Sequence, residues 1–327
     1  MIDSPCGTAP EPDQVILAIK QRRETVLQVI RSARERLLIS VFRCTDVAVL
    51  DAIGEALNRK VDVRFLMTPR ARGWEKRLKA LGTYLESMGA KVHPYSDPVV
   101  KYHAKYLLAD DGPALITSLN LTAKCFGATC DFILLTYDPG VVAGLRELFE
   151  LDWLAPHSTL SAHGNPRLIV GPERARAQFT ALLESAKRSI HIIDHKLDDP
   201  AMQALLKSKK AQGVDVRVLG QGNLGGLLAH GKLMIVDGRI AAIGSMAQTA
   251  MSLDFRREIA VTVEEPKCVR KLKNFYRLLA SGRELMDPAK ATAFVRVKRG
   301  RRPGGEASSR STRPAKTASW RQPGNAN

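Results

Sequence analysis

The sequence has little of what marks a secreted or membrane-spanning protein. Its five cysteines, at positions 6, 44, 125, 130 and 268 of 327, form no CxxC pair and no even disulfide framework. Apolar stretches such as Leu37–Phe42 and Phe132–Thr136 are far shorter than the ~18 residues of a membrane span. The first thirteen residues lack the basic and apolar regions of a signal peptide. We therefore expect a reduced, soluble, cytoplasmic protein.

Acidic residues are also scarce, with 33 Asp and Glu against 50 Lys and Arg, for a formal charge of +17. Such a surplus favours an anionic partner: nucleic acid, an anionic lipid surface or a phosphate-bearing substrate. Residues 296–327 carry +8 of this charge and are rich in Arg, Gly, Ser and Pro. We predict a disordered basic tail there, and peripheral contact with an anionic membrane or nucleic acid is its candidate use.

What the sequence does contain is an internal repeat. Val61–Leu66 recurs as Val214–Leu219, at an offset of 153, and the residues before each copy align at the same offset. Further on, the offset between His103 and His230 is 127, so the second copy lacks 26 residues between these two places. The missing unit corresponds to residues 74–95, and the glycine-rich stretch 220–226 stands in its place.

Strand and helix patterns alternate in both copies, which predicts an α/β fold of two pseudo-repeated halves, each with a mixed β-sheet flanked by helices. We expect the halves at 1–155 and 169–295, with a linker at 156–168. The first half is expected to open with an amphipathic helix over 14–34.

Polar residues recur at identical spacing after the two histidines. His103 is followed by Lys105, Asp110, Ser118, Asn120 and Asp131, and His230 by Lys232, Asp237, Ser245, Ala247 and Glu258. We predict strands at 103–109 and 230–236, where residues two apart share a face, so each histidine and its lysine point the same way. An Asp-Gly turn then brings the serine beside them. The odd spacing of Asp110 and Asp237 makes them face away, and we expect them to fix a loop or neighbouring backbone.

This set of groups suits a tetrahedral phosphate. Lysine neutralises charge, and Ser118, Asn120 and Ser245 donate hydrogen bonds to non-bridging oxygens. Two such surfaces would place two histidines on opposite sides of one phosphorus, where one attacks and the other protonates the leaving oxygen. Asp131 and Glu258 are candidates to hold the second ring nitrogen of the histidines. We expect no metal and no cofactor, because the two lysines supply the positive charge.

Two HxKxxxxD motifs in one chain, each followed by serine and a later acid, resemble the phospholipase D superfamily over about residues 14–285. The resemblance implies two α/β halves with one active site at their interface, a covalent phosphohistidine intermediate and no metal. It makes His103, Lys105, Asp110, His230, Lys232 and Asp237 the catalytic-motif residues. The N-terminal histidine is often the nucleophile in this family, which would make His103 the nucleophile and His230 the acid; the reverse stays open.

The sequence leaves the substrate open. We predict a metal-independent phosphodiester hydrolase or transferase that acts as a monomer on phosphatidyl lipids, with a nuclease of the same superfamily as a nearly equal alternative. A membrane-embedded cardiolipin synthase is not expected, since no hydrophobic N-terminal anchor is present. A non-catalytic nucleic-acid-binding protein is the third hypothesis. Its support is Ala247, which stands where the family usually has Asn.

Overall fold

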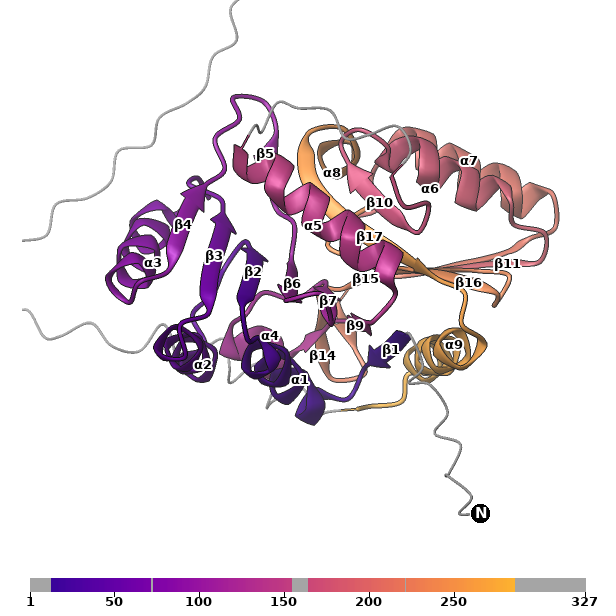
Figure 1. Ribbon diagram of the computed structural model, residues 1–327. Coiled ribbons are helices and arrows are strands. Elements are labelled where there is room, and N and C mark those ends of the chain that lie inside the picture. The colour runs from indigo at the N-terminus through magenta and orange to yellow at the C-terminus, as the bar shows by residue number, and fades with distance from the viewer. Residues whose placement is uncertain (1–12, 72, 155–163, 221, 286–327) are drawn as a thin grey trace, which may run out of the picture.

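The computed structural model describes residues 13–71, 73–154, 164–220 and 222–285. Within these ranges two β-sheets face each other, and helices cover them (Figure 1). Each sheet combines parallel and antiparallel strand pairs. The predicted α/β fold with two repeated halves and mixed sheets is therefore confirmed. The predicted tail at 296–327 and most of the predicted linker at 156–168 lie outside the described residues.

The two sheets share one strand order. Across the first sheet lie β1 (Asp13–Ile16), β9 (Ile133–Thr136), β7 (Ala114–Thr117), β6 (Tyr106–Ala109), β2 (Arg36–Val41), β3 (Asp62–Met67) and β4 (Lys91–Pro94). Across the second lie β10 (Leu168–Gly171), β17 (Arg256–Val263), β16 (Ile240–Gly244), β15 (Lys232–Val236), β11 (Ser189–Ile193) and β12 (Asp215–Leu219). Strand β4 and the preceding helix α3 (Glu75–Ser87) have no counterpart in the second half, which is the 26-residue difference seen in the sequence.

The glycine-rich stretch that replaces this unit forms a hairpin. Its strands β13 (Asn223–Leu224) and β14 (Leu227–Ala229) are joined by Gly225 and Gly226, whose φ angles of +59° and +84° favour glycine. Strand β14 pairs with β8 (Thr129–Cys130) of the first half. The replacement therefore ties the second half to the first.

Helices pack on the outer face of each sheet, and two further helices contribute to the core between the sheets. Helices α1 (Ile19–Ser32) and α2 (Val47–Asn58) pack on the first sheet, and α6 (Ala175–Glu184) and α7 (Pro200–Ala211) on the second. Helices α5 (Pro139–Leu154) and α9 (Pro266–Ala280) join the core between the sheets, and α4 (Ala123–Gly127) and α8 (Ala250–Asp254) are short. Within the described part of the chain, no helix has the length and apolar character to cross a bilayer.

The prediction of a helix from residue 14 was wrong at its start. Residues 13–16 form strand β1 at the edge of the first sheet, paired with β9, and the helix begins at Ile19. The physical reason is a period of two: Gln14 is exposed while Asp13 and Val15 are buried. Likewise Leu168, assigned to the linker, already begins strand β10.

Two short strands cross between the halves just before the motif histidines. Strand β5 (Lys101–Tyr102) pairs with Arg256 and Arg257 of β17, and β14 pairs with β8. The His103 N–H then donates to the Arg257 carbonyl at 2.9 Å. The prediction of continuous strands from His103 and His230 was therefore wrong at their first residues, because these backbones bond to the opposite half, and β6 and β15 begin later.

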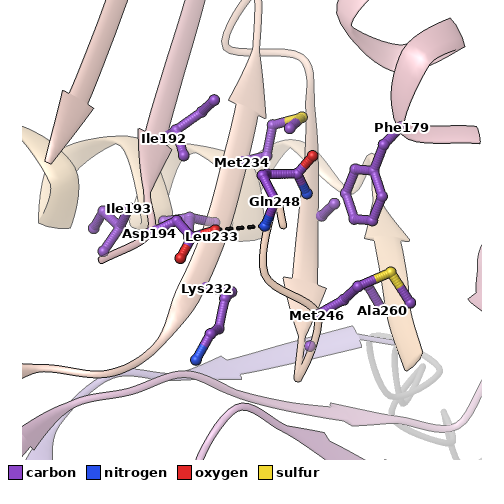
Figure 2. A pocket seen from close by; sticks show the side chains of 12 residues that line it. Phe179, Ile192, Ile193, Asp194, Lys232, Leu233, Met234, Met246, Gln248 and Ala260 are labelled. Atoms are coloured by element: carbon purple, nitrogen blue, oxygen red, sulfur yellow. Dashed lines mark hydrogen bonds between the residues drawn. The ribbon is translucent and has the colours of Figure 1, made fainter. Parts of the chain in front are cut away.

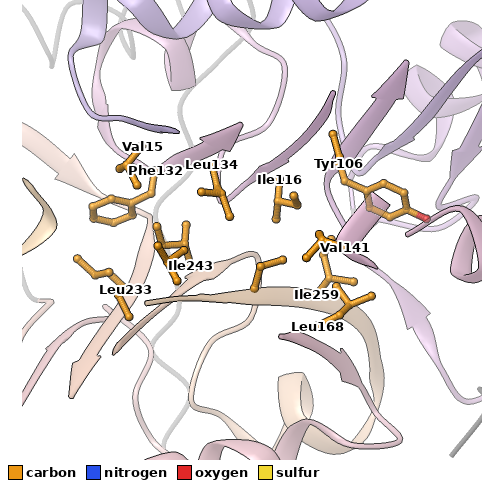
Figure 3. Packing of buried hydrophobic residues seen from close by; sticks show 14 of the residues in the cluster. Val15, Tyr106, Ile116, Phe132, Leu134, Val141, Leu168, Leu233, Ile243 and Ile259 are labelled. Carbon is orange, nitrogen blue, oxygen red and sulfur yellow. The ribbon is translucent and has the colours of Figure 1, made fainter. Parts of the chain in front are cut away.

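The inner faces of the two sheets share one apolar core (Figure 3). The first sheet contributes Val15, Ile116 and Leu134, and Phe132 comes directly before β9. The second sheet contributes Leu168, Leu233, Ile243 and Ile259. All are 2% exposed or less. Because burial of apolar surface is the main favourable term in folding, each half depends on the other to cover its inner face.

A buried ion pair fastens helix α5 to the second sheet. The Arg257 Nε lies 2.9 Å from Asp152 Oδ1, and both side chains are 3% exposed or less. The same guanidinium contacts Glu173 at 2.6 Å. Since Arg257 precedes Glu258 on β17, this pair also supports the strand that carries a predicted site residue.

The substitution Asp152→Ala should lower the free energy of unfolding by about 3 kcal/mol, because it leaves a buried guanidinium with one partner fewer. Chemical denaturation of the whole chain measures this loss. Glu150→Ala is the matched control on the same helix, since Glu150 is partly exposed and lies 3.4 Å from Arg64, and it should cost less than about 1 kcal/mol. Equal losses in the two variants would contradict a role of the buried pair.

Candidate active site

His103 is a neutral imidazole held by a carboxylate of the opposite half. Its Nδ1 contacts Glu258 Oε1, and Glu258 is completely buried on β17. Burial lowers the pKa of His103 well below its usual range, as do the charges of Lys105, Arg256, Lys232 and Lys196. Burial raises the pKa of Glu258. The Nδ1–H therefore donates to Glu258, which leaves Nε2 as the unprotonated ring nitrogen, with Lys105 Nζ 3.1 Å away.

His230 is held by an ionised carboxylate, again from the opposite half. Its Nδ1 lies 2.8 and 3.1 Å from the two carboxylate oxygens of Asp131. Burial alone would raise the pKa of Asp131, but His230, Arg22 and Ser118 together lower it to about 2. The Ser118 hydroxyl donates to Oδ1 at 2.6 Å, and the Thr129 hydroxyl donates to Oδ2. This carboxylate therefore stays negative and stabilises an imidazolium at His230.

The two motif lysines repeat one geometry. Lys105 Nζ donates to the His103 carbonyl at 2.8 Å, and Lys232 Nζ donates to the His230 carbonyl at 2.5 Å. Lys105 Nζ also lies 3.1 and 3.2 Å from the two ring nitrogens of His103. Burial and the charge of Lys232 lower the pKa of Lys105 and Glu258 raises it, so that the pKa is about 7. Two ammonium groups thus stand beside the two imidazoles.

The predicted phosphate-binding residues lie within this region with different partners. The Ser118 hydroxyl accepts the Phe132 N–H at 2.9 Å in addition to its bond to Asp131, and the Ser245 hydroxyl accepts the Ile259 N–H at 3.3 Å. Both serines are buried. Asn120 is nearly buried, and its Oδ1 has no hydrogen-bond partner in the described part of the chain. Ala247, its counterpart, is buried and offers no polar group.

Asp110 and Asp237 lie at the far ends of β6 and β15 from the histidines and touch neither of them. Asp110 accepts the N–H groups of residues 34, 35 and 36 at 2.8–2.9 Å. Asp237 accepts those of residues 187, 188 and 189 at 2.7–2.9 Å. Each carboxylate thereby fixes the turn that leads into β2 or β11. Asp110 and Asp237 therefore belong to the HxKxxxxD motif as residues that hold backbone, not as residues that contact the histidines.

Sequence reasoning missed Arg22, which is fully buried behind Asp131. Its guanidinium donates to the carbonyls of Thr129 at 2.6 Å and of Asp131 at 3.0 Å. The available signal was a charged residue at helical spacing from Val26 and Ile30 on the apolar face of α1. A basic residue there holds β8 and the start of the loop that carries Asp131.

His195 is a second residue that the motif does not reveal. Its ring stacks with that of His230 at a centroid distance of 6.3 Å. Burial, together with the charges of Lys232, Lys196 and His230, lowers the pKa of His195 to about 4. It is therefore a neutral imidazole beside the acid candidate.

In the described part of the chain, two cavities of very different size border the site. Figure 2 shows the narrow one behind Lys232, where the Gln248 N–H donates to Asp194 at 2.6 Å; its ≈10 Å³ suffices for one water. The other is a cleft of ≈620 Å³ that ends at His103. Its lining contains five basic residues, Arg43, Arg70, Lys101, Lys196 and Arg256, with Asp97 as its acid.

Among the described residues, one group of side chains has the chemistry of metal ligands. Potential donor atoms of Cys125, Asp131 and His230 lie within 4.8 Å of one another. Burial raises the pKa of Cys125, which disfavours the thiolate that a metal requires. Asp131 and His230 are already bonded to each other. Metal coordination would therefore compete with the His230–Asp131 hydrogen bond.

Comparisons with known proteins agree with this arrangement. The family model described as "Cardiolipin synthase, PLD-like domain" matches residues 26–153 and 223–279. Cardiolipin synthase 1 of Bacillus anthracis is 28% identical over 143 residues, which are 43% of this chain and 27% of that protein. The match thus spans about a quarter of the length of this curated relative.

Solved structures extend the likeness in fold. A polyphosphate kinase from Porphyromonas gingivalis has a TM-score of 0.68 at 17% identity, over 82% of this chain and 47% of that one. A phosphatidylserine synthase from Haemophilus influenzae Rd KW20 has a TM-score of 0.67 at 12% identity, over 89% and 94% of the two chains. With a family model that covers more than half of its residues and both HxKxxxxD motifs at one site, the chain belongs to the phospholipase D superfamily.

Proposed function

We propose that the protein cleaves phosphodiester bonds of phosphatidyl lipids through a covalent phosphohistidine on His103. The observation that carries the proposal is the contrast between the two crossed histidine–carboxylate pairs. His103 is neutral beside a buried carboxyl group of raised pKa, whereas His230 faces a carboxylate that stays ionised. One imidazole is prepared to attack and the other to hold a proton.

In the first step, Nε2 of His103 forms a bond to phosphorus while the bond from phosphorus to the leaving oxygen breaks. His230 donates its Nε2 proton to that oxygen, and Asp131 stabilises the imidazolium before the transfer. The ammonium groups of Lys105 and Lys232 offset the charge of the non-bridging oxygens. The amide of Asn120 is a further donor in the first half.

In the second step, His230 removes a proton from water or from an alcohol. The oxygen of that molecule bonds to phosphorus, and the bond from phosphorus to His103 breaks. Water completes a hydrolysis and an alcohol completes a transfer, with the same residues in the same roles. The neutral ring of His195 beside His230 is available to bind the incoming hydroxyl group.

The lipid substrate is supported by the family model and by the relatives. The matching family model is described as a cardiolipin synthase domain, and the curated relatives bear that name. A metal-independent nuclease is the second candidate, because the five basic residues in the cleft also fit a sugar-phosphate backbone. Release of headgroup from phosphatidyl lipid vesicles, compared with nicking of DNA or RNA, tests the choice.

The variants His103→Ala and His230→Ala should each lower kcat by about 10²–10⁴-fold or more, because each histidine serves a separate step. The double variant should lose little beyond the worse single variant, since the two residues act as a unit. Steady-state kinetics with a soluble phosphodiester measures these losses. Trapping of radiolabelled phosphate on His230→Ala but not on His103→Ala identifies the nucleophile, and the opposite labelling would reverse the roles.

The value of kcat/KM should fall as pH rises through about 7, because the buried ammonium of Lys105 then loses its proton. The low pKa of His103 and of Asp131 keeps the acid side of the profile flat below pH 6.5. Lys105→Arg is the matched variant, since a guanidinium keeps its charge, and the fall should move to higher pH in its residual activity. A fall that stays near pH 7 in this variant would assign it to a group other than Lys105.

Turnover should survive treatment with EDTA, because the two lysines supply the charge that a metal would otherwise provide. The assay compares initial rates before and after chelation and again after a divalent ion is added. Loss on chelation that the ion restores would contradict the proposal and point to the group formed by Cys125, Asp131 and His230.

A further inference from the structure

Three exposed apolar side chains lie on two segments that border the cleft and are joined by backbone pairing. Val99, Met251 and Phe255 are 61%, 41% and 45% exposed, and they are three of nine large apolar side chains exposed in the described ranges. Val99 lies just before β5, while Met251 and Phe255 belong to α8 and its end, and β5 and α8 lie side by side in Figure 1. We call these three residues the rim. Single exposed apolar residues are ordinary, whereas a group beside a substrate cleft indicates a contact surface.

Backbone hydrogen bonds hold the rim in this position. The Asp97 carboxylate accepts the N–H groups of Val99 and Val100, both at 2.7 Å. The Lys101 N–H donates to the Phe255 carbonyl at 3.0 Å, which joins the loop to the end of α8. Helix α8 is capped by the Thr249 hydroxyl, which accepts the Ser252 N–H at 3.0 Å. The rim side chains are therefore presented by ordered backbone from both halves.

Positive charge adjoins the rim. Lys101 follows the Val99 loop, and Arg256 follows Phe255, and both line the cleft that ends at His103. Arg43, Arg70 and Lys196 line the same cleft. Apolar side chains next to several cations form the combination that binds an anionic lipid surface, because apolar burial and attraction to anionic headgroups both contribute to binding.

We propose that the rim inserts into an anionic phospholipid surface, with the cleft opening toward the headgroups. This inference rests on the proposed function and narrows its substrate to lipid presented in a membrane. A nucleic acid accounts for the cations but not for Val99 and Met251, because aliphatic side chains neither stack on bases nor bind phosphate. Inserted in the boundary between headgroups and acyl chains, the same side chains leave water and contribute to binding.

The test is flotation of the full chain with vesicles of phosphatidylcholine alone or mixed with phosphatidylglycerol. The rim variant carries Val99→Ser, Met251→Ser and Phe255→Ser, and the matched control carries Val47→Ser, Tyr84→Ser and Val218→Ser, which are equally exposed elsewhere. The parent should prefer the mixed vesicles. The rim variant should bind them about tenfold more weakly, as expected for partial loss of three apolar contacts, and the control should bind as the parent does.

A second measurement separates this proposal from the function on which it rests. Turnover of a soluble phosphodiester should be the same in parent, rim variant and control, because the rim touches none of the reacting groups. Binding is also measured with His103→Ala, which should float as the parent does. Equal flotation of parent and rim variant, or no flotation of the parent, would overturn the rim proposal while leaving soluble turnover unaffected. An equal loss of oligonucleotide binding in the rim variant would overturn it in favour of nucleic acid.

Discussion

The crossed pairing of each histidine with a carboxylate of the other half is the constraint on which the rest of the molecule depends. His103 bonds to Glu258 and His230 bonds to Asp131. Neither imidazole has a defined tautomer without the opposite half. The shared apolar core, strands β5 and β14, and the buried pair of Arg257 with Asp152 all hold the halves in the one relative position that permits these bonds.

The two halves differ in the groups that surround their histidine-binding carboxylates. Asp131 is surrounded by donors, since Ser118 and Thr129 donate to its carboxylate and Arg22 lies behind it. Glu258 bonds to His103 through Oε1, and the Arg256 guanidinium lies 3.8 Å from that oxygen. The repeated backbone thus places two identical histidines beside carboxylates whose pKa values shift in opposite directions. Burial raises the pKa of Glu258, whereas His230, Arg22 and Ser118 lower that of Asp131.

Much of the fold was predictable because the chain contains a repeat. A strand or helix pattern found in one half could be compared with the aligned pattern in the other. Recurrence of the polar spacing located the histidines, lysines and acids that the structure brings together. It could not show which acid serves which histidine, because this depends on how two sheets dock. Arg22 was missed for a related reason. Its partners are the backbone carbonyls of residues 129 and 131, and every residue has such a carbonyl, so the sequence does not indicate the contact. Strand β1 was missed because four residues carry too short a pattern to distinguish two periods.

The span of the site along the chain has a consequence for how the protein folds. The His103–Glu258 bond joins residues 155 positions apart, and the His230–Asp131 bond joins residues 99 apart. Contacts between such distant residues form slowly, because a long loop must close before they give any stabilisation. We therefore expect the catalytic geometry to be among the last features to assemble. A newly synthesised chain in which one half has folded would have a histidine without its carboxylate partner. Both histidine–carboxylate bonds would form together when the second sheet docks.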